Sequence, residues 1–161
     1  LNIFVSTSFS KSFSLYGERV GALSVVGSSK EETDRVLSQL KIAIRTNYSN
    51  PPTHGGAIVA AVLGNPELRA MWEAELGEMR DRIRSMRLAM VEQLAAQGAK
   101  RDFSFVARQR GMFSYSGLTA EQVERLKNEF AIYAVGTGRI CVAALNRNNL
   151  DAVTRAIAQV I

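Results

Sequence analysis

The 161-residue chain has few of the residues that build disulfides, metal sites and histidine catalysis. Its only cysteine is Cys141, so neither an internal disulfide nor a cysteine-paired zinc site is possible. Its only histidine is His54, which excludes a pair of histidines acting together. The longest apolar runs, such as residues 57–63, are too short to span a bilayer. No secretory signal is recognisable, so the sequence favours a cytoplasmic protein that is not bound to membranes.

Charge is distributed in a way that argues against a nucleic-acid partner. The net charge is +5, but the basic residues are dispersed along the chain. Their densest stretch, residues 80–87, follows three glutamates and contains Asp81. Such mixing is typical of a solvated helix face. With 47% hydrophobic and 22% charged residues, the composition is that of a globular protein.

Two apolar segments near the start predict buried strands. Residues 1–5 and 20–26 are apolar on both faces, a pattern typical of strands inside a covered parallel sheet. A loop of small polar residues, 6–14, follows the first strand. The chain does not begin with methionine, and a buried strand needs neighbours. We therefore expect further sequence upstream of Leu1.

Residues 65–98 predict one long helix. Asn65 is a capping residue, and Pro66 suits the first turn. At 1.5 Å per residue, an apolar stripe of roughly thirty residues is about 45 Å long, which is typical of a connection between domains or subunits. The helix is expected to be unbroken, although Gly77 would be the likeliest position for a break, because glycine costs about 1 kcal/mol inside a helix. The apolar stripe is formed by residues at spacings of three or four, namely Leu68, Trp72, Leu76, Met79, Ile83, Met86, Met90 and Leu94.

The remaining segments predict an α/β chain. A helix is expected at residues 30–45, capped by Ser28 or Ser29, and another at 57–63. Two prolines and two glycines predict a loop at 47–56. A capping box, Thr119 with Gln122, starts a helix that ends near Phe130. Further elements are strands at 103–106, 112–115, 132–135 and 140–144, and a final helix at 148–161.

Lys11 is the first candidate for chemistry. Hydroxyl and aromatic residues surround it, and no carboxylate precedes Glu18. Few counter-charges and partial burial would lower the pKa of Lys11 and favour the neutral amine that Schiff-base chemistry needs. Ser8 and Ser10 offer hydroxyl donors, and Arg19 offers a guanidinium for a phosphate. On these residues alone, an ordinary surface-loop lysine is the alternative.

The string from Ser8 to Gly21 resembles the cofactor-lysine signature of the aspartate and aromatic aminotransferases, which use pyridoxal 5'-phosphate (PLP). In that signature a serine stands three residues before the lysine and an arginine eight residues after it, as Ser8 and Arg19 do here. The resemblance implies that Lys11 is the Schiff-base lysine and proton shuttle. It also implies that Ser8 and Arg19 hold the cofactor phosphate, with Ser10 assisting.

Two further segments resemble substrate-binding parts of the same family. Residues 44–52 are similar to the segment whose arginine crosses the dimer interface to bind the distal carboxylate of a dicarboxylic substrate. This implies substrate binding by Arg45, with Ser49 as a further candidate. Residues 138–143 resemble the segment whose arginine binds the α-carboxylate, which implies that role for Arg139. The alternatives are helix-dipole compensation for Arg45 and a strand-edge charge for Arg139.

Three other residues are expected to be structural. His54 lies in a loop, and Trp72 lies on the apolar stripe of the long helix, where a place in the core is expected rather than stacking on a cofactor. Cys141 is expected to be a small buried hydrophobe.

The resemblance covers the whole chain and implies a fold and an activity. The fold is the carboxy-terminal part of an aspartate aminotransferase-like PLP-dependent transferase. Residues 1–64 would end the large PLP-binding domain, 65–98 would be the interdomain helix, and 99–161 would form a small α/β domain. The full-length protein would be a homodimeric aminotransferase moving an amino group from an aromatic or dicarboxylic L-amino acid to a 2-oxo acid.

The 161 residues are expected to lack part of the cofactor site. In this family the groups that contact the cofactor ring lie upstream of the lysine, and only ten residues precede Lys11. The 161 residues alone are therefore expected to be inactive. Residues 12–14 and 110–115 resemble bacterial aromatic aminotransferases more than strict aspartate aminotransferases. A PLP-type fold that binds a ligand without turnover, or that only dimerises, is the alternative function.

Overall fold

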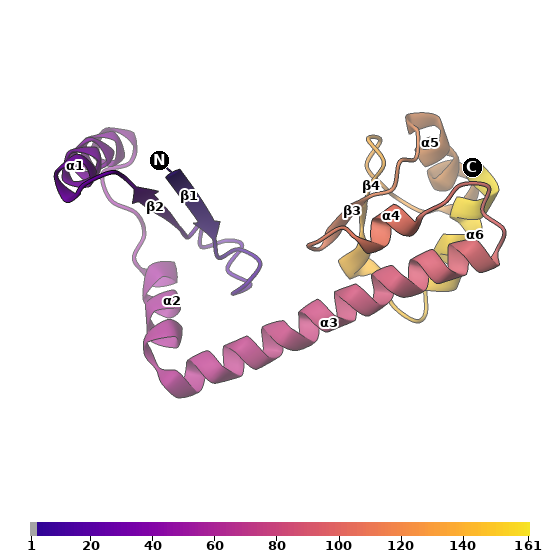
Figure 1. Cartoon of the computed structure of the whole chain (residues 1–161), viewed down its shortest axis with the longest axis horizontal. Helices are drawn as coiled ribbons and strands as arrows, with labels where there is room; N and C mark the ends of the chain where they lie inside the picture. Colours follow the sequence, from indigo (N-terminus) through magenta and orange to yellow (C-terminus); the bar gives the residue numbers. More distant parts are fainter. Residues whose placement is uncertain (1–2) are drawn as a thin grey trace. The chain divides into compact units, whose positions relative to one another are not determined.

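The computed structural model of the chain describes residues 3–161 and divides into two compact units (Figure 1). The first unit is Leu1–Leu76 and the second is Gly77–Ile161. The boundary falls inside the longest helix, α3 (Pro66–Ala96). None of the described helices combines the length and the apolar character needed to cross a membrane.

The first unit begins with two paired strands, β1 (Ile3–Ser8) and β2 (Gly21–Val26). They are antiparallel, with a register from Ile3 opposite Val26 to Ser8 opposite Gly21. The expectation of strands buried in a parallel sheet is therefore wrong for the described residues, and residues 1 and 2 of the first expected strand lie outside them. Parallel neighbours need a long crossover, usually a helix, whereas residues 9–20 form a loop of turns.

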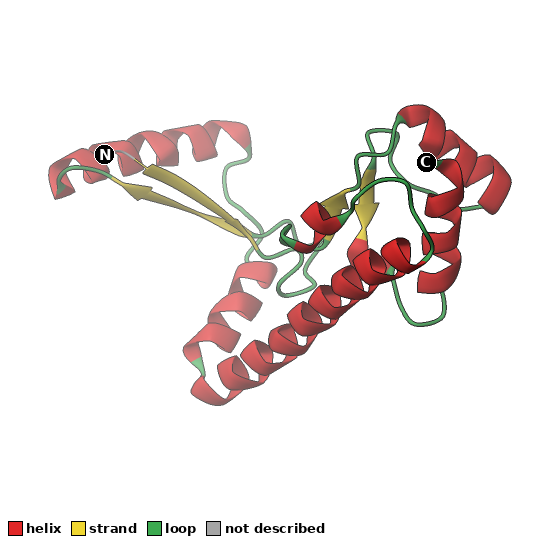
Figure 2. Ribbon diagram, turned by 45° about the vertical axis from the view of Figure 1, so that its right-hand side comes forward, coloured by secondary structure: helices red, strands yellow, loops and turns green. Residues whose placement is uncertain are grey.

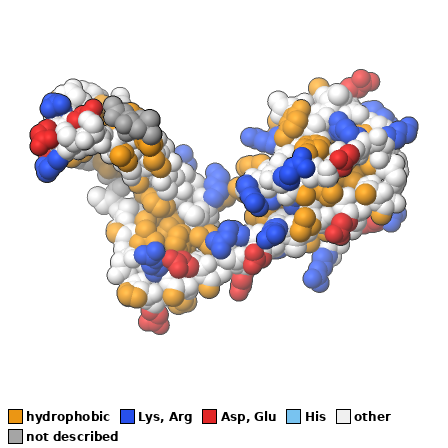
Figure 3. Space-filling view, in the orientation of Figure 1, with side chains coloured by type: hydrophobic (Ala, Val, Ile, Leu, Met, Phe, Trp, Pro, Cys, Tyr) orange, Lys and Arg blue, Asp and Glu red, His pale blue; other side chains and the backbone are white. Residues whose placement is uncertain are grey.

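Both strands of this pair leave large side chains at the surface, where Figure 3 shows hydrophobic groups on the first unit. Phe4 is 63% exposed and Leu23 is 48% exposed. Apolar residues on both faces of a strand indicate that both faces can be covered, but they do not encode the direction of the neighbouring strand.

Helix α1 (Lys30–Asn47) follows β2 and has well-formed ends. The Ser29 side chain accepts a hydrogen bond from the Glu32 backbone N–H at 3.2 Å, as expected for a capping serine. At the other end the Tyr48 N–H donates to the Ile44 carbonyl at 3.1 Å. The helix therefore ends two residues later than the sequence predicts.

Helix α2 (His54–Gly64) begins inside the segment predicted to be a loop. The prediction is wrong for residues 54–56, because the glycines there are helical. A Cβ on Gly55 would lie 2.8 Å from the Glu18 Cβ and 3.2 Å from a Val20 methyl group. Gly55 is therefore explained by close packing of α2 on the segment after Lys11, rather than by a turn.

Helix α3 is continuous over 31 residues, which confirms the long helix and the absence of a break at Gly77 (Figure 2). The Asn65 side-chain oxygen accepts hydrogen bonds from the N–H groups of Glu67 at 2.9 Å and Leu68 at 3.1 Å. These bonds satisfy two of the donors that a helix start leaves open, so Asn65 is the expected cap.

The second unit packs short elements around the carboxy-terminal part of α3. Strands β3 (Phe113–Tyr115) and β4 (Arg139–Cys141) pair antiparallel, and α5 (Ala120–Phe130) packs against α6 (Leu150–Val160). Thr119 and Gln122 form both bonds of the expected capping box. The core of this unit is formed by apolar residues that include Met90, Leu94, Val106, Leu126, Val142 and Ile157.

Three strand predictions in this unit need correction. Residues 104–107 form the short helix α4 (Ser104–Ala107), because the Asp102 carboxylate accepts hydrogen bonds from the Ser104 N–H and hydroxyl. Residues 132–135 are not a strand, since the Ile132 N–H donates to the Leu126 carbonyl at the end of α5. The strand expected at 140–144 is β4 followed by the 3-10 turn η1 (Val142–Ala144).

Candidate active site

Lys11 lies in the loop of residues 9–20 that connects β1 to β2. Turn-like backbone bonds shape this loop: the Phe13 N–H donates to the Phe9 carbonyl at 3.1 Å, and the Ser14 N–H donates to the Lys11 carbonyl at 3.3 Å. The Lys11 Nζ lies 4.9 Å from the centre of the Tyr16 ring. The side chain is exposed, not partly buried as expected, because it lies over this one ring on the surface of its own loop.

The strand pairing brings the two ends of this loop together. Ser8 lies opposite Gly21, and the Phe9 N–H donates to the Val20 carbonyl at 3.2 Å. A Cβ on Gly21 would lie 2.6 Å from the Thr7 carbonyl oxygen, so glycine permits this close approach. Ser8 at one end of the loop and Arg19 at the other are thereby held near each other.

Three of the four residues predicted to hold the cofactor, Ser10, Lys11 and Arg19, lie on this loop, and Ser8 ends β1 directly before it. Ser8 Oγ accepts a hydrogen bond from the Ser10 N–H at 3.3 Å, and Ser10 is only 5% exposed. The exposed Arg19 has a positive φ of 53° and donates to the Tyr16 carbonyl at 2.7 Å. Two hydroxyls, an amine and a guanidinium are a donor set that suits a phosphate ester beside a carbonyl group.

Trp72 contacts this loop, and the sequence did not indicate that contact. Its indole N–H donates to the Ser12 carbonyl at 2.7 Å. Its ring stacks on Phe13 with 4.7 Å between ring centres. The expectation placed Trp72 in the core, whereas it is half-buried against the residues that follow Lys11. The partners are 60 positions apart, so no local pattern could have identified them.

Arg45 and Ser49 lie together where α1 ends. The Arg45 guanidinium donates a short hydrogen bond to the Ser49 hydroxyl. Ser49 has a positive φ of 67°, which turns the chain back beside the last turn of α1. Both residues are exposed. Arg45 also lies near the negative end of the helix dipole, so its position fits both the substrate-binding and the structural interpretation.

Arg139 opens β4 in the second unit. Its guanidinium lies 4.9 Å from the centre of the Phe113 ring, on the paired strand β3. A cavity of about 290 Å³ is lined by Arg139 together with Phe113, Tyr133 and the half-buried Cys141. A cation beside aromatic faces can bind a carboxylate while offering apolar surface to the rest of a ligand.

Gly138 sets the backbone in front of Arg139. Its φ is +82°, and an added Cβ would lie 2.6 Å from the Leu118 carbonyl oxygen. The Gly138 carbonyl accepts hydrogen bonds from the Ser116 N–H at 2.9 Å and the Ser116 hydroxyl at 2.6 Å. A side chain at this position therefore requires a backbone shift, which would disturb these two bonds.

We expect Gly138→Ala to destabilise the full-length protein by more than about 1–2 kcal/mol, the usual cost of left-handed backbone for an L-residue. The clash with Leu118 adds to that cost and displaces Arg139. The measurements are urea unfolding and the KM of an amino-acid substrate. Gly136→Ala is the matched control, because nothing lies within 4 Å of the Cβ it would add. Equal stability of the two variants would contradict the prediction.

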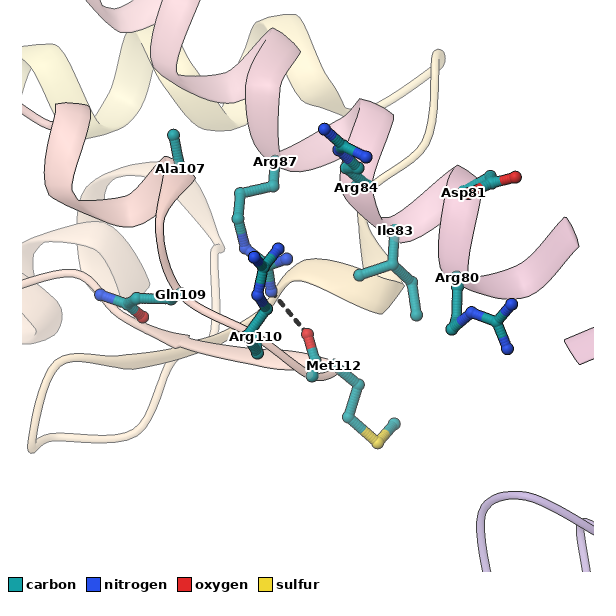
Figure 4. A pocket seen from close by; sticks show the side chains of 10 residues that line it. Arg80, Asp81, Ile83, Arg84, Arg87, Ala107, Gln109, Arg110 and Met112 are labelled. Carbon is teal, nitrogen blue, oxygen red and sulfur yellow. Dashed lines mark hydrogen bonds between the residues drawn. The ribbon is translucent and has the colours of Figure 1, made fainter. Parts of the chain in front are cut away.

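A second cavity of about 290 Å³ in the same unit is strongly basic (Figure 4). Figure 4 shows the guanidinium groups of Arg87 and Arg110 close together. Arg87 is buried and donates to the Gly111 carbonyl at 2.5 Å and to Ser114 Oγ at 3.2 Å. Burial and the positive charge of Arg110 lower the pKa of Arg87. None of the predicted site residues lines this cavity.

Comparison with known proteins gives consistent matches along the chain. The profile of the family described as aminotransferase class I and II matches residues 1–157. The chain is 77% identical over 161 residues to an aspartate aminotransferase of Pseudomonas aeruginosa and 52% identical over 161 residues to an aromatic-amino-acid aminotransferase of Escherichia coli. These alignments cover 100% of this chain in each case, and 40% and 41% of the respective relatives.

A solved structure matches the fold equally well. The crystal structure of an aromatic-amino-acid aminotransferase from Burkholderia pseudomallei, covalently bound to pyridoxal phosphate, superposes with a TM-score of 0.94 at 74% identity. The match covers 99% of this chain and 40% of that one. The expected fold is therefore confirmed, and the chain spans about 40% of the length of these relatives. The chain belongs to the class I and II aminotransferase family.

Proposed function

We propose that the full-length protein is a PLP-dependent aminotransferase that moves an amino group from an aromatic or dicarboxylic L-amino acid to a 2-oxo acid. We further propose that it acts as a cytoplasmic homodimer. The observation that carries the proposal is the loop between β1 and β2, which contains Lys11, Ser10 and Arg19 and directly follows Ser8, the last residue of β1. Relatives named as aspartate and as aromatic-amino-acid aminotransferases support the same activity.

The residues of this loop have separate tasks. Bound PLP supplies an electron sink for a negative charge at the substrate α-carbon. Arg19 and the hydroxyls of Ser8 and Ser10 hold its phosphate, since charge-assisted hydrogen bonds are about twice as strong as neutral ones. The Lys11 amine would anchor the cofactor covalently until the amino group of the substrate displaces it. The freed amine would then carry the proton between the substrate α-carbon and the cofactor.

The two arginines of the site orient the substrate. Arg139 binds the α-carboxylate, because a planar guanidinium sets the direction of a carboxylate as well as balancing its charge. Arg45, supported by Ser49, binds the distal carboxylate of a dicarboxylic substrate in the neighbouring subunit of the dimer. Phe113 and Tyr133 line the cavity of Arg139, and their rings suit an aromatic side chain.

The domain organisation forms part of the proposal. Residues 1–64 end a large PLP-binding domain, 65–98 form the interdomain helix, and 99–161 form a small α/β domain. The division of the chain into units that meet inside α3 supports a connecting role for this helix.

The decisive experiment is covalent trapping in the full-length protein. PLP is added to the apo-protein, its visible absorbance is recorded, and borohydride then fixes the cofactor to the lysine that carries it. Peptide mapping is expected to place the label on Lys11. A label on Lys30, Lys41 or another lysine would contradict the assignment. A label on Lys11 without any turnover of amino acids would favour the ligand-binding alternative.

A further inference from the structure

Trp72 holds the backbone directly after Lys11 from a different element of the fold. Its indole N–H donates to the Ser12 carbonyl at 2.7 Å, one residue beyond the lysine. Its ring lies on that of Phe13, with 4.7 Å between centres and 24° between planes. Phe13 in turn meets the edge of Phe9 at 5.5 Å. Aromatic contacts therefore flank Lys11 on both sides along the chain.

This segment needs such support, because little regular structure holds it. Lys11 lies in turns, outside the ladder of β1 and β2. Ser14, three residues later, has a left-handed φ of 55°, which a non-glycine residue keeps only where its surroundings hold it. Loops of this kind are mobile unless they are tied to a rigid element. Helix α3, continuous over 31 residues, is the rigid element to which Trp72 ties it.

We propose that Trp72 is a positioning residue for Lys11. Its hydrogen bond to Ser12 and its stacking on Phe13 hold the loop of residues 9–20 in the conformation in which the Lys11 amine can react with the cofactor. Trp72 acts through these two residues and is not itself a catalytic residue. The proposal rests on the proposed function of Lys11 as the cofactor lysine. It assigns the single tryptophan of this chain a task beyond filling the core.

The two contacts of Trp72 can be separated by substitution. Trp72→Phe keeps a ring against Phe13 but removes the only N–H of the side chain, so the Ser12 carbonyl loses this donor. Trp72→Leu removes both the donor and the ring. Met71→Leu is the matched control, because Met71 is the preceding residue of α3 and is 64% exposed.

The test uses the full-length protein and measures how fast PLP added to the apo-protein becomes bound to Lys11, followed by visible absorbance. Trp72→Phe is expected to slow this step about fivefold, the equivalent of one ordinary hydrogen bond. Trp72→Leu is expected to slow it roughly tenfold or more, since the aromatic pair is lost as well. The pH at which the visible absorbance changes is expected to shift in both variants. In both variants kcat is expected to decrease in the same order as the attachment rate, while KM for the amino acid stays near the parental value.

The outcomes separate the inference from the proposed function. Parental attachment rates and an unchanged absorbance profile in Trp72→Phe, with the borohydride label still on Lys11, would overturn the positioning role alone. A loss of unfolding stability with no other change would also overturn it, because it would indicate core packing. A label absent from Lys11 in the parent protein would instead overturn the proposed function.

Discussion

Replacing Lys11 by alanine in the full-length protein is expected to lower turnover of every amino-acid substrate by at least on the order of 10²–10⁴-fold, the usual contribution of a positioned acid–base group. The variant loses the covalent anchor and the group that moves the α-proton. Ser10 and Arg19 on the loop and Ser8 at the end of β1 do not depend on the amine, so the phosphate of PLP is still expected to bind.

Steady-state kinetics and the PLP content after gel filtration together check this expectation. Lys11→Arg keeps the positive charge but cannot supply a neutral amine, so it is expected to be as inactive as the alanine variant. Lys30→Ala is the control, since Lys30 is exposed on α1 and pairs with Asp34. Activity of Lys11→Ala within tenfold of the parent would show that another group moves the proton.

The second large effect separates the roles of Arg45 and Arg139. Every amino acid carries an α-carboxylate, so Arg139→Leu is expected to lower kcat/KM for aspartate and phenylalanine alike. Only dicarboxylates carry a second carboxylate, so Arg45→Leu is expected to affect mainly aspartate. The loss of a charge-assisted hydrogen bond costs about 1.5–3 kcal/mol, which is roughly a ten- to hundredfold loss in kcat/KM.

The measurement is a comparison of both substrates in each variant of the full-length protein. Phenylalanine is expected to be turned over by Arg45→Leu as well as by the parent, or better, because its side chain offers no carboxylate to pair with a guanidinium at the substrate. Ser49→Ala removes the acceptor that holds Arg45 and is expected to give a smaller loss for aspartate in the same direction. Equal losses for both substrates in Arg45→Leu would assign that residue a structural role at the end of α1.

Much of the candidate site could be predicted, because the residue patterns that indicate it lie within short continuous segments of the chain. The spacing of Ser8, Lys11 and Arg19 lies within one continuous string. The segments around Arg45 and Arg139 are equally compact. Helix starts at Asn65 and Thr119 were predicted correctly because a capping side chain bonds to backbone only two or three residues away. In each case the interacting groups are close in sequence, so the sequence alone determined them.

Tertiary contacts decided the features for which no local signal exists. Gly55 of α2 lies so near Glu18 and Val20, far upstream in the chain, that a Cβ there would be 2.8 Å from the Glu18 Cβ. The direction of β1 and β2 follows from the turns of the loop between them, which the apolar pattern of the strands does not encode. The contacts of Trp72 with Ser12 and of Arg139 with Phe113 join residues distant in the chain. Only the folded chain brings such pairs together, because periodicity and capping describe neighbours within a few residues.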